Sequence, residues 1–253
     1  MILRMENITL RRGGKLLLKN ITGELAPGYL HFLAGVNGSG KSSLLKTLCG
    51  YYRPDSGEVR LDEKPLSQIS GTQRARRLGV ISQNSMIALD FTAREMVMLS
   101  ASARFPRLGN WSREQLQCID RALEQFNLTH LANQPIKTLS GGEFQRVQIA
   151  GMAALQPEIM LLDEPVSAMD PVGRNQIMVF LEEYARTHTV LMITHDFELL
   201  GRAGGDLWCL DKEHNFYSGK ASELLNEKFL SMLYNSPATV EVSANGCRRI
   251  YFD

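Results

Sequence analysis

The stretch "GVNGSGKSS", residues 35–43, decides the fold that this sequence predicts. It fits the pattern G-x-x-x-x-G-K-[ST], in which backbone N–H groups close around phosphate oxygens. An apolar run, residues 30–35, precedes it and a helical pattern follows, which is the strand, loop and helix context that the pattern requires. The stretch therefore predicts a nucleotide-binding α/β domain built around a phosphate loop.

The residue types in this loop suit the chemistry of nucleotide phosphates. Glycine permits close backbone approach, and the following helix offers its N-terminal dipole to the same negative charge. We expect Lys41 to neutralise the β and γ phosphates and the Ser42 hydroxyl to bind Mg²⁺. The alternative is a glycine-rich turn with a surface lysine. The expected nucleotide contacts are Gly35, Val36, Asn37, Gly38, Ser39, Gly40, Lys41, Ser42 and Ser43.

Other apolar runs extend the α/β prediction along the chain. Residues 158–165 and 189–196 lack the alternation of a half-exposed strand, and residues 78–83 form a shorter run of the same kind. Such strands are typical of a parallel sheet covered on both faces. Helical patterns separate the runs, so we predict alternating strands and helices.

Two parts of the chain are expected outside this parallel sheet. Residues 2–10 and 16–25 alternate apolar and polar positions around a "RRGGK" turn and, with residues 56–65, predict an antiparallel β subdomain. Residues of about 84–155 interrupt the alternation with mostly helical sequence, which we interpret as an inserted helical subdomain. The predicted fold class is thus α/β, a P-loop NTPase core with both additions.

Composition limits the classes of partner. The chain has 28 Lys and Arg against 27 Asp and Glu, a near balance that argues against coating nucleic acid, so no nucleic-acid partner is expected. Its 4 cysteines have no CxxC or His-rich spacing, which indicates neither a disulfide scaffold nor a zinc site. We find no window of about 18 apolar residues and no signal-peptide pattern, so neither a membrane span nor export is expected.

An acidic pair follows one of the buried runs. "LLDEP" places Asp163 and Glu164 at the carboxyl end of a strand, where ligands of open α/β sheets bind. We expect Asp163 to hold Mg²⁺ through water, and Glu164 to accept a proton from the water that attacks the γ-phosphate. The alternative is a polar strand end before a proline that stops strand pairing.

Two further polar residues follow apolar strands. His195, in "LMITHD", is expected beside the γ-phosphate as a hydrogen-bond donor, although a histidine at a strand end is often structural. Gln83, after "LGVIS", is a candidate contact for Mg²⁺ and the attacking water, or a surface amide. Together with Lys41 and Glu164 they complete the expected catalytic set.

The stretch "TLSGGEFQRVQIAG", residues 138–151, puts two glycines at a predicted helix start, although each helical glycine costs about 1 kcal/mol relative to alanine. Ser140 and Glu143 predict a capping box. Gly141 and Gly142 would leave the helix end, with its orphan N–H groups, open to a second anion. Such a helix serves the same nucleotide only if it folds onto its own phosphate loop or if a second copy supplies it. The residues alone do not decide between these two arrangements.

The phosphate loop, Gln83, "LSGGE", "LLDEP", "SAMD" (residues 167–170) and His195, in this order, resemble the ATP-binding subunits of ABC transporters over residues 1–232. The resemblance implies ATP and Mg²⁺ as cofactors and a head-to-tail homodimer in which each LSGGE covers the ATP of the other copy. It also implies that Asp170 links the two sites. The region around Gln83 would receive a helix from an integral membrane permease, at the cytoplasmic face of the inner membrane.

The chain departs from the family pattern at the position that contacts the adenine base. The position where the family stacks an aromatic ring on the base falls at Arg12 or its neighbour Arg11. A guanidinium can stack on a flat π system with about 0.5–2 kcal/mol available, so base binding need not be lost. Phe144 stands where relatives frequently have arginine, and "VSAMD" replaces the usual "TSALD". Neither change removes a catalytic group.

Among ABC proteins, single cassettes of this length resemble importers for iron chelates, haem or cobalamin, which also employ a substrate-binding protein. Those relatives often show Gly-Arg-x-Pro-His and then Trp; Arg104, Pro106 and Trp111 agree with that pattern, whereas Ala103 replaces the glycine and Arg107 the histidine. An amphipathic helix followed by a Pro-terminated loop is the alternative for this stretch. Importers for zinc or manganese and a soluble ABC ATPase for cofactor assembly stay as alternatives. After the ATPase domain, residues 233–253 predict a tail hairpin that turns at Asn245 and Gly246.

Overall fold

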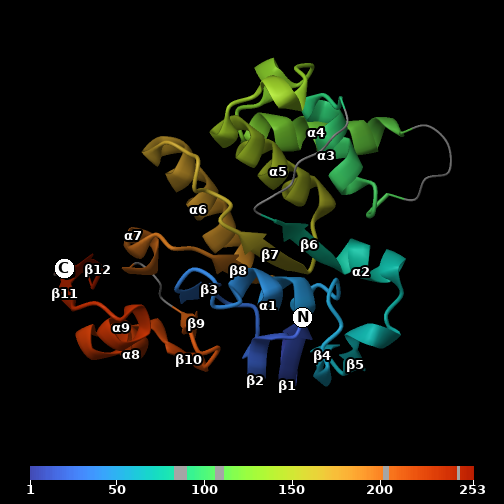
Figure 1. Ribbon diagram of the computed structural model, residues 1–253. Coiled ribbons are helices and arrows are strands. Elements are labelled where there is room, and N and C mark those ends of the chain that lie inside the picture. Colours follow the sequence, from blue (N-terminus) through green and yellow to red (C-terminus); the bar gives the residue numbers. More distant parts are fainter. Residues whose placement is uncertain (83–89, 106–110, 202–204, 244–245) are drawn as a thin grey trace. The chain divides into compact units, whose positions relative to one another are not determined.

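A computed structural model describes residues 1–82, 90–105, 111–201, 205–243 and 246–253. It contains two compact units (Figure 1). The first comprises Met1–Ile69, Leu161–Glu164 and Tyr184–Asp253, and the second comprises Ser70–Met160 and Pro165–Glu183.

An antiparallel sheet lies at the start of the first unit. Its strands are β1 (Leu3–Arg12), β2 (Lys15–Leu25), β4 (Ser56–Leu61) and β5 (Lys64–Pro65), in the order β2-β1-β4-β5. One face of the sheet packs on the core while the other meets solvent, so β1 buries every second residue except between Met5 and Ile8, where the register of its pairing with β2 shifts. The predicted antiparallel β subdomain is confirmed.

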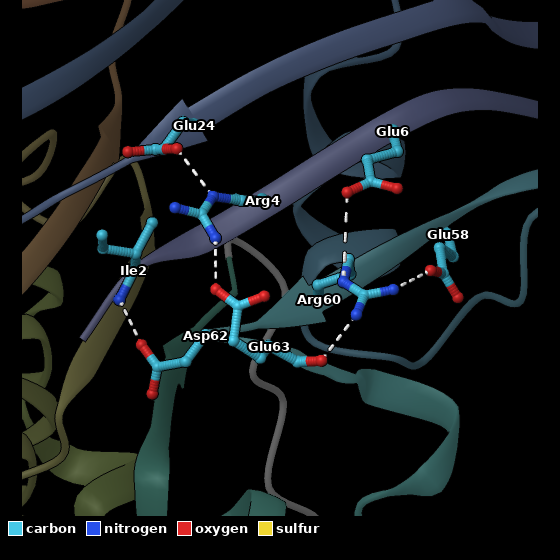
Figure 2. A network of polar contacts seen from close by, with 8 residues as sticks. All are labelled: Ile2, Arg4, Glu6, Glu24, Glu58, Arg60, Asp62 and Glu63. Atoms are coloured by element: carbon cyan, nitrogen blue, oxygen red, sulfur yellow. Dashed lines mark hydrogen bonds and ion pairs between the residues drawn. The ribbon is translucent and has the colours of Figure 1, made fainter.

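Ion pairs tie the strands of this sheet together on its solvent side (Figure 2). Nε of Arg4 donates to Glu24 at 2.7 Å and Nη1 to Glu63 at 2.9 Å, which joins β1 to β2 and to the turn after β4. Arg60 pairs with Glu58 and also donates to the carbonyl oxygen of Glu63. Exposed pairs contribute only about 0–1 kcal/mol each, so the buried side of the sheet dominates its stability.

A second sheet forms the centre of the first unit. It contains β3 (Leu30–Gly35), β7 (Ile159–Asp163), β8 (Thr189–Ile193), β9 (Asp206–Leu210) and β10 (Phe216–Lys220), and within this unit the order is β10-β9-β3-β8-β7. Strand β3 pairs in parallel with β8 and β9. Every residue of β3, β7 and β8 is buried, as their continuous apolar sequences predict.

Short helices and a hairpin complete the first unit. The helices are α1 (Lys41–Leu48), α7 (Phe197–Gly201), α8 (Ala221–Leu224), α9 (Glu227–Tyr234) and a 3₁₀ turn, Leu66–Gln68. Strands β11 (Ala238–Val242) and β12 (Arg248–Phe252) pair antiparallel. The predicted turn residue Asn245 lies outside the described residues, whereas Gly246 has a φ of 81°.

The second unit is mainly helical. It holds α2 (Gly71–Arg77), β6 (Leu78–Ile81), α3 (Ala93–Ala101), α4 (Arg113–Gln125), α5 (Gly141–Leu155), most of α6 (Pro171–Ala185), and 3₁₀ turns at Thr129–Leu131 and Ile136–Thr138. Capping boxes begin α2, α3, α4 and α5, so each start is set by residues three apart in the sequence.

The second unit includes all described residues of the expected 84–155 subdomain, together with α2, β6 and most of α6. The fully buried ring of Phe126 meets that of Phe180 edge-on, with centroids 5.1 Å apart. This contact joins the end of α4 to α6. Within the described part of the chain, no helix has the length and apolar character that a bilayer crossing needs.

Candidate functional site

The phosphate loop connects β3 to α1, and its glycines are required by backbone geometry. Gly35, Gly38 and Gly40 have φ values of 139°, 81° and 106°. A Cβ on Gly35 would lie 2.1 Å from the carbonyl oxygen of Leu210, and one on Gly40 would lie 2.4 Å from that of Leu17. Only glycine fits these two positions, because the neighbouring backbone cannot move away from an added methyl group.

Lys41 points its ammonium group at this loop. Its Nζ donates to the carbonyl oxygens of Gly35 at 2.8 Å and Val36 at 2.9 Å. Burial lowers the pKa of Lys41, while the nearby Glu164 and Asp163 carboxylates raise it. An ammonium group has three donors, so one proton is left for a further acceptor.

Asp163, at the end of β7, and Ser42, the second residue of α1, lie close to each other. Asp163 is only 5% exposed, and Ser42 is close enough to influence its carboxylate. Burial raises the pKa of Asp163, the nearby Ser42 hydroxyl lowers it, and the charge of Glu164 raises it further. A hydroxyl and one carboxylate are oxygen ligands of the kind that Mg²⁺ combines with substrate phosphates and water.

Glu164 and His195 meet beside this pair. Nδ1 of His195 lies 2.8 Å from Oε1 of Glu164, with the two side chains 64% and 16% exposed. Glu164 has a φ of 52°, and its backbone N–H donates to the carbonyl oxygen of Ile193 at 3.1 Å. The structure thus brings together the two residues that sequence analysis placed after separate strands.

His214 was missed by sequence analysis. It lies in the turn between β9 and β10, and its Nδ1–H donates to the carbonyl oxygen of Ser39 in the phosphate loop at 3.0 Å. Asp211 holds the same turn by accepting hydrogen bonds from the N–H groups of Glu213 and Asn215, at 2.8 and 2.9 Å. No motif marks His214, because its sequence, "DKEHN", resembles any polar turn.

Arg12 lies at the end of β1, with its guanidinium carbon 4.9 Å from the centre of the Tyr52 ring. Lys46 approaches the same ring at 5.7 Å. Tyr52 was also missed, since it follows α1 with no pattern that ties it to β1. The contact is a cation–π pair, which orients the Arg12 guanidinium plane.

In the second unit, Ser140 begins α5 with the capping box that the sequence predicts. Its Oγ accepts from the N–H of Glu143 at 3.3 Å, and Oε2 of Glu143 accepts from the N–H of Ser140 at 2.8 Å. The hydrogen bonds from the Ser140 hydroxyl and backbone lower the pKa of Glu143. The helix therefore begins with its capping carboxylate held ionised.

A small cavity of about 180 Å³ lies at this helix start. Oδ1 of Asp170 accepts from the N–H groups of Val172 and Gly173, both at 2.9 Å, and these bonds lower its pKa. The cavity is lined by Ser140, Gly141, Gly142, Glu143, Arg146, Ala168, Met169, Asp170 and Gly173. The expected second anion site and Asp170 thus share one hollow within the second unit.

Close packing is a second reason for the two glycines of α5. A Cβ on Gly141 would lie 3.1 Å from Cβ of Ala168, and one on Gly142 would lie 2.9 Å from the Ala168 carbonyl oxygen. The segment that carries Asp170 therefore approaches the bare helix closely. The sequence pattern indicates only an approaching anion as the reason for the two glycines, and this contact with Ala168 is a second one.

The described residues do not include the whole expected site. Gln83 and Pro106 lie outside the described residues. Across the residues that are described, no group of three or more His, Cys, Asp or Glu side chains could hold a metal ion. Asp163 and Ser42 would accordingly need phosphate oxygens and water to complete a Mg²⁺ site, as that ion commonly does.

Comparisons with known proteins agree on one family. The family model described as "ABC transporter" matches residues 18–167. The hemin import ATP-binding protein HmuV of Pseudomonas aeruginosa is 36% identical over 246 residues, which cover 95% of this chain and 95% of that protein. The ferric enterobactin transport ATP-binding protein FepC of Escherichia coli K12 is 32% identical, over 92% of this chain and 86% of that protein.

A solved structure shows the same fold. It is a dimeric ATP-binding cassette in a post-hydrolysis state, bound to ADP and Pi. Its TM-score to this chain is 0.74 with 26% sequence identity, over 87% of this chain and 98% of that one.

Proposed function

The chain belongs to the ABC transporter family, and on this premise we propose that it is the ATP-hydrolysing subunit of an importer for an iron chelate. The chain is an ABC transporter ATPase. The cargo class rests on its similarity to proteins named for the transport of hemin and of ferric enterobactin. Hydrolysis rests on one observation, the contact between Glu164 and His195 beside the phosphate loop.

ATP would bind with its phosphates in the loop of residues 35–43. The backbone N–H groups and the third proton of Lys41 would hold the β and γ phosphates, and the N-terminal end of α1 would add its dipole. The base would stack on Arg12, whose guanidinium already lies over Tyr52. A guanidinium sandwiched between two flat π systems is a favourable arrangement for both faces.

Ser42 and Asp163 would hold Mg²⁺ together with phosphate oxygens. When bound, the ion would neutralise charge on the β and γ phosphates. Burial already penalises the ionised Asp163 carboxylate, so a cation beside it would remove an unfavourable charge state. Gln83 is proposed as a further contact of the metal and the attacking water.

Glu164 would accept a proton from the water that attacks the γ-phosphate, and His195 would orient the carboxylate. The Nδ1–H of His195 donates to Glu164, which leaves Nε2 facing away from that bond. A neutral imidazole donates from one nitrogen only, so donation from Nε2 to a phosphate would need the imidazolium form. General-base assistance of this kind contributes about 10²–10⁴-fold to a rate.

A second copy of the chain would complete each ATP site. Ser140, Gly141, Gly142 and the helix N–H groups would approach the γ-phosphate bound by the other copy, a partner for the orphan donors of a helix start. Asp170 would connect the two sites from the same cavity. A solved relative of this fold is a dimeric cassette, which supports the arrangement.

The dimer would bind integral membrane permease subunits at the cytoplasmic face of the inner membrane, in a system with a substrate-binding protein. To test this, tagged Glu164→Gln protein is solubilised from native membranes with ATP and Mg²⁺, and co-purifying proteins are identified by mass spectrometry. Samples without nucleotide serve as the control. A polytopic membrane protein is expected. Recovery of soluble proteins alone would contradict the importer and favour a cofactor-assembly ATPase.

The cargo class has a separate test in cells that lack the chain. We expect them to lose growth when hemin or a ferric siderophore is the only iron source, while growth on a ferrous salt continues. A growth defect confined to zinc or manganese limitation would contradict the iron-chelate proposal. Restoring the wild-type chain, but not Glu164→Gln, should restore growth.

A further inference from the structure

Three aromatic rings from separate elements meet behind the segment that carries His195. Phe197 begins α7, Tyr234 ends α9 and Phe252 ends β12. The Phe252 ring centroid lies 4.9 Å from that of Phe197 and 5.1 Å from that of Tyr234, and the last two are 5.2 Å apart. These three rings, the aromatic triad, therefore join the C-terminal hairpin to the segment two residues beyond His195.

The hairpin also contacts the other end of α7. A Cβ on Gly201, the last residue of α7, would lie 1.9 Å from the carbonyl oxygen of Arg248 in β12. This approach is close enough that only glycine is accommodated without a shift of the backbone. Strand β12 thus touches α7 at its first residue through Phe252 and at its last through Arg248.

Two local hydrogen bonds connect α7 to the residues on either side of His195. The Asp196 N–H donates to Oγ1 of Thr194 at 3.0 Å, and Oδ1 of Asp196 accepts from the Glu198 N–H at 2.8 Å. His195 lies between Thr194, which follows the end of β8, and Asp196, whose side chain accepts from the first turn of α7. A displacement of α7 would therefore move the His195 backbone.

Tyr234 contributes a buried hydroxyl to the triad. Its buried hydroxyl has no hydrogen-bond partner among the residues that the structure describes. Burial raises the pKa of Tyr234, as expected for a hydroxyl shielded from water.

We propose that the C-terminal hairpin positions His195 for ATP hydrolysis through the aromatic triad, with Phe252 as the positioning residue that the hairpin supplies. The inference rests on the proposed role of His195 beside Glu164. Without the Phe252 ring, α7 loses its support and the contact from Nδ1 of His195 to Oε1 of Glu164 loosens. Lys41 is held by the carbonyls of Gly35 and Val36, so ATP binding is expected to persist.

The first test compares Phe252→Ala with Tyr251→Ala. Tyr251 is the adjacent residue of β12, 49% exposed and outside the triad. We expect kcat of Phe252→Ala to fall about ten-fold, below the ~10²-fold cost of a 1 Å misplacement, with KM for ATP nearly unchanged. Tyr251→Ala should match the wild type. An unchanged kcat in Phe252→Ala would overturn the inference.

A double-mutant comparison separates positioning from general weakening. If Phe252 acts through His195, then Phe252→Ala combined with His195→Ala should turn over ATP as fast as His195→Ala alone. A further loss of about ten-fold in the double variant would show that Phe252 acts elsewhere, and would overturn the inference.

Amide hydrogen exchange gives a readout that does not depend on ATP hydrolysis. Residues 196–201 should exchange faster in Phe252→Ala than in Tyr251→Ala. If the wild type hydrolysed no ATP, the proposed function would fail while this comparison still tested the contact. Should Phe252→Ala not fold, Phe252→Leu replaces it, with a smaller change expected. Exchange and kcat both equal to the wild type in that variant would overturn the inference.

Discussion

Nδ1 of His195 lies 2.8 Å from Oε1 of Glu164. The two residues follow β8 and β7, which are neighbouring strands of one sheet. Glu164 has a φ of 52°, a conformation that non-glycine residues seldom adopt and that often marks a functional site. The bond from the Glu164 N–H to the Ile193 carbonyl, 3.1 Å long, holds that backbone in place. The carboxylate is therefore directed at the imidazole by the sheet itself.

Replacing Glu164 by Gln should separate ATP binding from ATP hydrolysis. Glutamine keeps the shape but cannot accept the proton of the attacking water, so turnover should fall by about 10²–10⁴-fold. Binding of a fluorescent ATP analogue should persist. Steady-state phosphate release measures the loss, with Glu223→Gln on the exposed side of α8 as the control. Turnover near the wild-type rate would refute the assignment of Glu164.

Gly142→Ala should destabilise the fold, although alanine favours helix by about 1 kcal/mol. Its Cβ would lie 2.9 Å from the Ala168 carbonyl oxygen, and such overpacking costs about 1–3 kcal/mol. Gly71→Ala is the control, because Gly71 also follows a capping serine and has nothing within 4 Å of the added Cβ. Urea unfolding measures both. A Gly142→Ala variant as stable as the wild type would contradict the packing account.

Arg12→Ala should weaken ATP binding by about 2- to 30-fold, the equivalent of a cation–π contact of 0.5–2 kcal/mol. Inorganic triphosphate, which lacks a base, should bind both proteins equally. Arg11→Ala is the matched neighbour, since Arg11 contacts Asp55 through its backbone N–H, which the substitution retains. Titration of ATP and triphosphate measures each affinity. If Arg11→Ala shows the larger loss, the base stacks on Arg11 instead.

Asp163→Asn should stabilise the nucleotide-free protein at pH 7. Burial raises the pKa of Asp163 in the fold, so the folded state binds more protons than the unfolded state as pH rises above 3.8. The contribution of Asp163 to stability is therefore present at low pH and lost as pH rises through the raised pKa. Asparagine removes this loss.

Urea unfolding at pH 7 and below pH 3.8 measures the difference, which should shrink in acid. ATP with Mg²⁺ should stabilise the wild type and have a smaller effect on Asp163→Asn, because a ligand that binds only the folded state adds stability. A variant less stable than the wild type at pH 7 without nucleotide would contradict the account.

The sequence predicted the features that local patterns encode. The phosphate loop, the strand that ends at Asp163, the strand that ends two residues before His195, and the capping box from Ser140 to Glu143 are each set by a few consecutive residues. The ABC cassette fold with its antiparallel β subdomain is confirmed. Patterns of this kind identify the groups that meet a nucleotide because the chemistry requires fixed spacing.

Contacts between distant residues could not be predicted in this way. His214 and Ser39 are 175 positions apart, and no spacing rule connects them. The approach of Ala168 to Gly142 depends on how one segment packs against a helix, which a single sequence does not display. The roles assigned to Gln83 and Asp170 and the domain limit at residue 232 stay predictions.

Ser140→Arg should block hydrolysis while ATP still binds the phosphate loop, because the bulky cation would fill the cavity at the start of α5. Binding and turnover are measured on the same samples. If the variant lost binding and turnover equally, the helix would belong to the same copy's nucleotide site. Ser102→Arg, at the half-buried C-cap of α3 in the same unit, is the control for an added arginine.

The central claim, that two copies complete each other's ATP sites, is tested most directly by mixing two inactive variants. Glu164→Gln keeps an intact α5 start and Ser140→Arg keeps an intact phosphate loop, so a mixed pair contains one complete site. A 1:1 mixture should recover up to about a quarter of the wild-type turnover, since half of randomly formed pairs are mixed and each has one working site of two. Turnover no higher than that of either variant alone would contradict the head-to-tail dimer.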